Sequence, residues 1–262
     1  MFSGGVSLDY TIEGKKATHL AESTVVAFPL NLPKAAFRLG QTGSVIDPAR
    51  DIAEGANRSL WCADWVDASD DRVGMTIVPV DMPLVSVGDT GIYKFSPQQV
   101  PADPVIYAHL SNTQWGTNFP QWLEGDFNFR VELAPHTGDW RTGKVWQHTY
   151  AIDHRDLRPE GENRGVTDLP LELPEGLVLQ SLRPQHDGSG FVVRYWDALG
   201  MHRRYLLNVW GPIAKVWRCD LMERPIEELR IDEWISKRGG SHTSIRAEIA
   251  PHAIETILIE FG

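Results

Sequence analysis

Apolar and polar residues alternate in short runs along this chain, and Gly, Pro, Asn and Asp separate the runs. In the clearest run, at 126–133, Phe127, Phe129, Val131 and Leu133 alternate with polar residues. Successive side chains of a strand point to opposite faces, so one face of this segment is predicted to be buried and the other wet. Further strands are predicted at 24–28, 35–39, 74–80, 91–95, 105–110, 177–182, 191–197, 203–209 and 253–261.

One segment predicts a helix, which Asp139 is placed to cap. Its apolar stripe consists of Trp140, Val145, Trp146, Thr149 and Tyr150. The stretch 156–176 combines prolines, glycines and charges without usable periodicity, and it predicts a long loop. Strands on both sides of this loop, without an internal repeat, favour a mainly β chain with one short helix, folded as a single large antiparallel β-sandwich over 1–262. A split into two domains stays open.

Length and composition exclude several classes of protein. The 262 residues contain 42% hydrophobic residues and ten Trp, which is enough material for a large core and excludes a disordered chain. A net charge of −10 is the wrong sign for a phosphate-backbone binder, so no nucleic acid partner is expected. The two cysteines, Cys62 and Cys219, are too few for a disulfide framework and are predicted to be small core residues.

The sequence predicts a cytoplasmic chain with no membrane partner. The first ten residues lack a basic region followed by an apolar run, and no window approaches eighteen uninterrupted apolar residues. The sequence leaves self-association open, including a homo-oligomer.

Local motifs for metal binding and covalent catalysis are not found. The sequence contains no His-Glu-x-x-His, no Cys-x-x-Cys, no calcium loop and no Gly-x-Ser-x-Gly. The tripeptide His154-Arg155-Asp156 is interpreted as a coincidence in a chain rich in His and Asp. No catalytic residue and no metal ligand are therefore predicted.

An acidic run at 64–71 contains Asp64, Asp67, Asp70 and Asp71. A glycosidase needs a pair of carboxylates facing one bond. Asp also favours turns, because its side chain bonds its own backbone, so the run is interpreted as a solvated turn before the next strand. The neighbouring Trp61 and Trp65 are predicted to be core residues.

The segment from Asn112 to Trp122 combines two Trp, two Asn and a Gln in a loop between strands. Sugar sites use an aromatic plane against the apolar sugar face and amides for the hydroxyls. Composition alone favours the alternative that Trp115 and Trp122 anchor the loop by packing or belong to a face buried by another domain.

Taken together, an ordered series of stretches resembles the C-terminal region of glycoside hydrolase family 38, the α-mannosidase family. The matching stretches are ESTVVAFPL (22–30), WVD (65–67), GMTI (74–77), DMPLV (81–85), NTQWGTN (112–118), FNFR (127–130), SLRP (181–184), GFVVR (190–194), DLME (220–223) and IETIL (254–258). The resemblance implies a large antiparallel sandwich of the galactose-mutarotase-like type, a supersandwich.

The resemblance also implies that catalysis lies elsewhere. In that family the Asp nucleophile, its acid partner and the zinc lie mainly in an N-terminal α/β barrel and a helical segment, which nothing here matches. Retaining hydrolysis requires two carboxylates about 5 to 5.5 Å apart. We therefore expect no hydrolysis by this chain alone and no cofactor in it, with zinc in a catalytic domain outside it.

The role implied by the resemblance is accessory: the chain packs on a catalytic barrel domain or subunit and contributes to carbohydrate binding. C-terminal loops of this family reach toward the sugar. On that basis the predicted substrate-binding residues are Trp115, Asn118 and Asn112, with Arg130 in second place.

Two alternatives remain open. One is a mutarotase-like sugar epimerase, in which His109 or His136 would exchange protons together with Glu132 or Asp139. The other is a standalone carbohydrate-binding module that uses the Trp115 loop.

Overall fold

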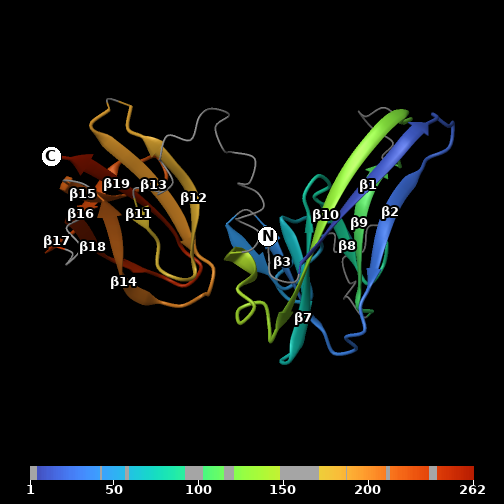
Figure 1. The fold of residues 1–262 in the computed structure, drawn as a ribbon, viewed down its shortest axis with the longest axis horizontal. Coiled ribbons are helices and arrows are strands. Elements are labelled where there is room, and N and C mark those ends of the chain that lie inside the picture. Colours follow the sequence, from blue (N-terminus) through green and yellow to red (C-terminus); the bar gives the residue numbers. More distant parts are fainter. Residues whose placement is uncertain are drawn as a thin grey trace. The chain divides into compact units, whose positions relative to one another are not determined.

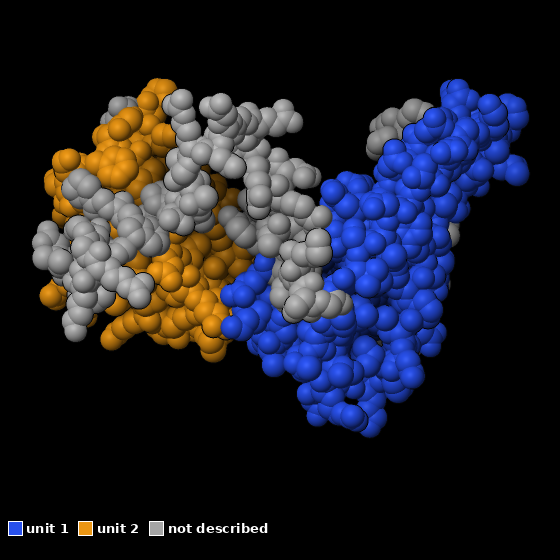
Figure 2. Space-filling model, viewed as in Figure 1, with its two compact units in different colours: residues 1–156 blue, residues 157–262 orange. Residues whose placement is uncertain are grey.

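The computed structural model describes residues 5–41, 43–56, 59–91, 103–114, 121–147, 171–186, 188–210, 213–235 and 241–262. The chain divides into two compact units, residues 1–156 and 157–262, which Figure 2 colours separately and which are described here one by one. In both, the described regular structure consists of antiparallel strands, apart from a short helical segment that follows β10. The predicted fold class, a mainly antiparallel β-sandwich, is confirmed, whereas the single domain over 1–262 stays a prediction.

The first unit consists of two antiparallel sheets (Figure 1). Its strands are β1 (Val6–Lys15), β2 (Ser23–Pro29), β3 (Ala36–Gln41), β4 (Ser44–Ile46), β5 (Trp61–Cys62), β6 (Trp65–Ser69), β7 (Val73–Pro79), β8 (Leu84–Val87), β9 (Val105–Asn112) and β10 (Gly125–Thr137). The strand order is β1-β10-β7-β6-β3-β4 in the six-stranded sheet and β2-β9-β8-β5 in the four-stranded sheet.

Alternation along each strand separates a core face from an outer face in the six-stranded sheet. On β6, Val66 and Ala68 point into the core, so Trp65, Asp67 and Ser69 lie on the outer face. Residues from both sheets form the core: Phe28, Phe37, Leu39, Trp61, Ala63, Val66, Ala68, Ile77, Met82, Val85, Val87, Ile106, Ala108 and Val131. The core lies between the two sheets, and the sequence prediction that Trp61 and Trp65 are buried is confirmed.

The segment after β10 buries its aromatic side chains. Trp140 and Trp146 are each 3% exposed, and their rings meet edge to face with centroids 5.9 Å apart. Trp140 also lies 6.2 Å from the ring of Trp65, which comes from the outer face of β6. The segment therefore packs on the outer face of the six-stranded sheet through large apolar surfaces.

The predicted helix is present as a short helical segment with a buried apolar stripe, but it begins at Val145, later than predicted, and Asp139 caps the turn before it. Asp139 Oδ1 accepts hydrogen bonds from the backbone N–H and the hydroxyl of Thr142, which is capping geometry. Turns then lead to helical residues at 145–147, and Trp140, Val145 and Trp146 are buried. The predicted residues Thr149 and Tyr150 lie outside the described part of the chain.

The second unit is also a two-layer β-sandwich. Its strands are β11 (Leu171–Glu172), β12 (Leu177–Pro184), β13 (Gly190–Asp197), β14 (Arg203–Trp210), β15 (Ile213–Cys219), β16 (Pro225–Glu228), β17 (Ile231–Ile235), β18 (Ser241–Ile249) and β19 (Ile254–Phe261). Their order is β11-β14-β18-β17 in one sheet and β12-β13-β19-β15-β16 in the other. The core between the sheets contains Leu171, Leu177, Phe191, Val193, Tyr195, Tyr205, Leu207, Val209, Val216, Leu229, Ile245, Ala247, Ile249, Ile257 and Ile259.

Some sequence predictions were wrong. The run 64–71 is a solvated turn only at its end, because Asp67 lies inside β6 with no exposed surface. The predicted loop 156–176 includes β11, whose Leu171 pairs with β14, and its residues 156–170 lie outside the described part. Cys62 is exposed rather than in the core, whereas Cys219 is buried as predicted. Of the predicted strand 91–95, only Gly91 is described, and it is not in a strand.

Within the described residues, no helix has the length and apolar character needed to cross a membrane.

A single buried carboxylate joins three segments of the second unit. Asp197 has no exposed surface and accepts hydrogen bonds from the backbone N–H groups of Met201 and His252. Its other oxygen lies 2.8 Å from the guanidinium of Arg203. The end of β13, the start of β14 and the turn before β19 therefore depend on one side chain.

We predict that Asp197→Ala lowers the free energy of unfolding by about 3 kcal/mol, because the partly buried Arg203 charge and two backbone donors lose their acceptor. Urea denaturation followed by tryptophan fluorescence measures this loss. Asp232→Ala is the control, since its carboxylate pairs with the exposed side chains of Arg230 and Arg246. Equal stability of the two variants would contradict the role of Asp197.

Candidate functional site

A buried carboxylate on the outer face of the six-stranded sheet is the centre of a polar cluster. Asp67 is 0% exposed, and Ser69 Oγ donates to its Oδ1 over 2.6 Å. Thr76 Oγ1 and His136 Nε2 bond the other oxygen at 3.0 and 2.6 Å. We call Asp67, Ser69, Thr76 and His136 the buried polar cluster. Burying a charge without partners is costly, and these three bonds offset that cost.

Strand pairing brings these residues together from three strands. Asp67 on β6 lies directly opposite Thr76 on β7, and Ser69 lies opposite Gly74. His136 on β10 lies opposite the same Gly74. Directly opposite residues share a face, so all of these positions lie on the outer face.

Two glycines leave the space that the His136 ring occupies. A Cβ added at Gly74 would lie 2.3 Å from Cε1 of the ring. A Cβ added at Gly143, in the segment that covers this face, would lie 2.4 Å from Nδ1. The imidazole is therefore held between two backbone segments, and its side chain is 6% exposed.

The electrostatic setting of His136 favours its charged form. Burial lowers the pKa of the ring, but the hydrogen bond and the charge of Asp67 outweigh it, so the pKa lies above the ordinary 6.5. A histidine that holds its proton more tightly when folded adds stability that is fully present below pH 6.5. That stability is lost as the pH rises through the folded pKa.

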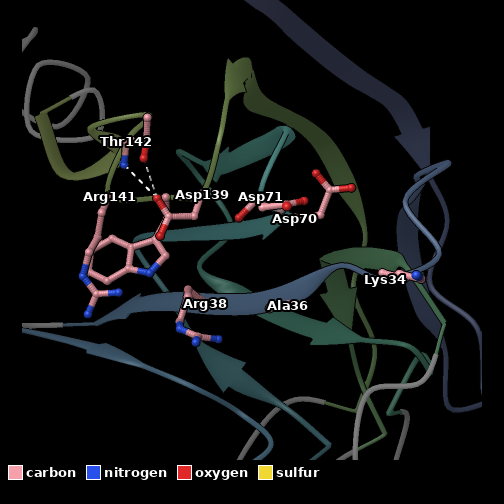
Figure 3. A pocket seen from close by; sticks show the side chains of 10 residues that line it. Lys34, Ala36, Arg38, Asp70, Asp71, Asp139, Arg141 and Thr142 are labelled. Atoms are coloured by element: carbon pink, nitrogen blue, oxygen red, sulfur yellow. Dashed lines mark hydrogen bonds between the residues drawn. The ribbon is translucent and has the colours of Figure 1, made fainter.

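The hollow beside this cluster has a volume of about 550 Å³, within the roughly 300 to 1,000 Å³ typical of small-molecule sites. Its lining comes from the start of β3, from the end of β6 and the turn after it, and from the segment after β10 (Figure 3). These residues are Lys34, Ala36, Arg38, Ser69, Asp70, Asp71, Asp139, Trp140, Arg141 and Thr142. Ser69 belongs to both the hollow and the buried polar cluster.

Charged groups of both signs surround the hollow. Asp70 Oδ1 accepts the backbone N–H groups of Arg72 and Val73, which lowers the pKa of its carboxyl. Burial opposes ionisation of Asp139, but the bonds from Thr142 outweigh it and the pKa of Asp139 is lowered. Both carboxyls are therefore ionised at neutral pH, and they accept hydrogen bonds without donating any.

The structure places the predicted site residues as follows. Trp115 and Asn118 lie outside the described residues. Asn112 ends β9 in the four-stranded sheet, where its Oδ1 accepts the backbone N–H of Gln114 at 2.9 Å. Arg130 lies on β10 in the other sheet, with its Nε 3.9 Å from Asp81. Asn112 and Arg130 are thus in different layers of the sandwich, and their role stays a prediction.

Trp122, at the end of the predicted sugar segment, is 62% exposed. The alternative in which it anchors the loop by packing is therefore wrong for Trp122. Its exposed ring surface is compatible both with ligand contact and with a face buried by another domain, so these two alternatives stay predictions.

In the epimerase alternative, His109 or His136 was expected to act with Glu132 or Asp139, but the hydrogen-bond partners found are different. His136 bonds Asp67, whereas the carboxylate of Asp139 bonds Thr142. His109 is 4% exposed, and its Nε2 lies 3.1 Å from the hydroxyl of Ser86. Burial lowers the pKa of His109. Both rings are buried, so neither is open to a sugar.

Sequence reasoning missed most of the hollow. Asp67 and His136 had each been considered, but for other roles and not as a pair. The missing signal was the register of β6, β7 and β10, which decides that residues 69 positions apart meet. The local signal in the sequence was the small size of residues 36, 69 and 74. Small side chains at these positions leave room on the outer face for the His136 ring and for the hollow.

Comparison with known proteins identifies the second sandwich. Residues 176–257 match the family model described as "Glycosyl hydrolases family 38 C-terminal beta sandwich domain". The resemblance expected from the sequence is confirmed over these residues, which lie in the second unit. No curated protein matches the sequence.

Two solved structures share the fold. An α-mannosidase from Enterococcus faecalis V583 is 15% identical with a TM-score of 0.68, over 99% of this chain and 27% of that protein. A protein in glycosyl hydrolase family 38 from Enterococcus faecalis is 16% identical with a TM-score of 0.65, over 99% of this chain and 28% of that protein. This chain therefore spans about a quarter of their length.

We predict that His136 titrates above pH 6.5 and His109 below it, because Asp67 stabilises the charge on His136 while burial opposes the charge on His109. NMR titration of the histidine ring protons measures both values. In Asp67→Asn the pKa of His136 should fall below 6.5, whereas that of His109, on the other sheet, should not change. An unchanged pKa of His136 in this variant would contradict the assigned pair.

Proposed function

We propose that this chain is the C-terminal accessory β-sandwich region of an α-mannosidase-like glycoside hydrolase. It packs on a catalytic domain and contributes to carbohydrate binding. The family match at 176–257 carries the proposal. The fold shared with the solved α-mannosidase over nearly the whole chain supports it, and so does the small share of that protein that the chain spans.

Hydrolysis is assigned to the catalytic domain. Retaining hydrolysis needs two carboxylates about 5 to 5.5 Å apart, open to the substrate. The acid at the centre of the buried polar cluster, Asp67, is closed off from a sugar. Zinc is likewise assigned to the catalytic domain, as the resemblance to family 38 implies. Among the described residues, no group of three or more His, Cys, Asp or Glu is placed to hold a metal.

Carbohydrate contact is proposed for the first unit through the segment from Asn112 to Trp122, with Trp115 and Asn118 as its central residues and Arg130 in second place. The exposed ring of Trp122 supports an aromatic contact there. A standalone carbohydrate-binding module would use the same segment and differs only in needing no catalytic partner. The cytoplasm remains the proposed compartment.

The test is recovery of the chain from its own cells with an affinity tag at endogenous level, followed by an assay on an aryl α-mannoside with zinc added. We expect activity in the recovered material, together with a family 38 catalytic domain on the same or a second polypeptide. The recombinant 262-residue chain should be inactive, since the resemblance places the nucleophile and its acid partner in the catalytic domain.

A matched assay on an aryl β-glucoside controls for contaminating glycosidases and should give no signal above that of an untagged strain. Mannoside binding by recovered material that contains no catalytic domain and no α-mannosidase activity would favour the standalone module instead.

A further inference from the structure

The hollow beside the buried polar cluster has a small floor and polar walls. Ala36 and Ser69, directly opposite each other on β3 and β6, are both short side chains. Asp70 and Asp71 rise from the β6–β7 turn, and Asp139 and Thr142 come from the segment after β10 (Figure 3). The hollow is therefore deep because Ala36 and Ser69, at its bottom, have short side chains.

Both hydroxyls of the hollow have their hydrogen committed inward. Ser69 Oγ donates to Asp67 at 2.6 Å, and Thr142 Oγ1 donates to Asp139 at 2.9 Å. A hydroxyl has one hydrogen and two lone pairs. Thr142 therefore presents an acceptor toward a ligand, whereas Ser69 is only 3% exposed and closes the bottom of the hollow.

The carboxylates around the hollow add further acceptors. Asp70 and Asp139 are ionised at neutral pH, as shown above, and Asp71 is exposed. A ligand that fills the hollow must bring several hydrogen-bond donors to satisfy these groups.

Three cations balance the three carboxylates. Lys34 is exposed at the rim, the guanidinium of Arg38 lies 3.2 Å from Asp47, and Arg141 lies over the Trp140 ring at 4.4 Å. The formal charge of the lining is zero, because Lys34, Arg38 and Arg141 oppose Asp70, Asp71 and Asp139. The hollow thus suits a neutral ligand better than an ion.

The same chemistry disfavours the other ligand classes. Phosphate and other anions would be repelled by the three carboxylates as well as attracted by the three cations, so they gain no net charge attraction. A metal ion needs ligands gathered in one place, and no such group of three exists among the described residues. A sugar brings several hydroxyl donors on a neutral ring.

We propose that this hollow, defined by Ala36, Ser69, Asp71, Asp139 and Thr142, is a subsite for a neutral pyranoside whose hydroxyls donate to Thr142 and the carboxylates of Asp71 and Asp139. The inference rests on the proposed function and assigns part of its carbohydrate binding to a place outside the segment from Asn112 to Trp122.

The geometry also sets the strength of binding. Trp140 is 3% exposed, so its ring face is not open for stacking on a sugar. Binding then depends on hydroxyl bonds exchanged with water, each of which contributes little net free energy. We expect a millimolar dissociation constant that depends little on salt, because the ligand is neutral.

The experiment is an NMR titration of the ¹⁵N-labelled 262-residue chain with methyl α-D-mannopyranoside. The amides of residues 69–71 and 139–143 should shift in fast exchange. Asp71→Asn should weaken binding about tenfold, since it removes a charged acceptor. Asp9→Asn carries the same change at an exposed position on β1 and should leave the affinity within about twofold.

A second variant tests the floor. Ala36→Tyr fills the hollow from an exposed position and should abolish the shifts at 69–71 and 139–143 while the rest of the spectrum stays folded. Retained binding in this variant would overturn the subsite.

Other probes separate the alternatives. Shifts of the same amides by inorganic phosphate, calcium chloride or methylammonium at equal concentration, with none by the mannoside, would overturn the proposal. Mannoside shifts confined to residue 112 and its neighbours up to 122 would also overturn it, but would leave the accessory function standing. If the mannoside shifts no amide while the material recovered from cells has α-mannosidase activity, the subsite is overturned and the accessory function stands.

Discussion

The outer face of the first unit depends on one buried charge. Asp67 has no exposed surface and can remain there because Ser69, Thr76 and His136 all bond it. Those three bonds fix the hydroxyl of Ser69 toward the sheet and hold the imidazole at the end of β10. Loss of any one partner would leave part of a buried carboxylate unsatisfied, so the cluster holds β6, β7 and β10 in register.

The covering segment depends on the same face. Trp65 requires a glycine beside it, because a Cβ at Gly40 would lie 2.1 Å from its ring nitrogen. Trp140 packs next to Trp65, and Gly143 makes room for His136. Burial of Trp140 and Trp146 brings Asp139 and Thr142 to the wall of the hollow. Packing of the covering segment beside the buried polar cluster thus forms the hollow, whose wall presents hydrogen-bond acceptors.

Much of the fold was predictable from periodicity alone. The run from Phe127 to Leu133 alternates as a half-buried strand should, and it lies within β10. The prediction was wrong where two effects compete: Asp in the run 64–71 favours a turn, yet tertiary packing draws Asp67 into β6. The site was less predictable, since an Asp67–His136 contact across 69 residues follows from strand order and register, which one sequence does not contain. Motifs such as GFVVR at 190–194 suggested the resemblance to family 38. The family model later matched residues 176–257, which include this motif.

The most direct measurement is a crystal structure of the chain soaked with an α-linked mannobiose well above its dissociation constant. The account predicts a sugar ring over Ala36, with one hydroxyl donating to Thr142 Oγ1 and another to a carboxylate of Asp71 or Asp139. A hollow that holds only water at that concentration, with the sugar bound elsewhere on the chain or not at all, would contradict the account.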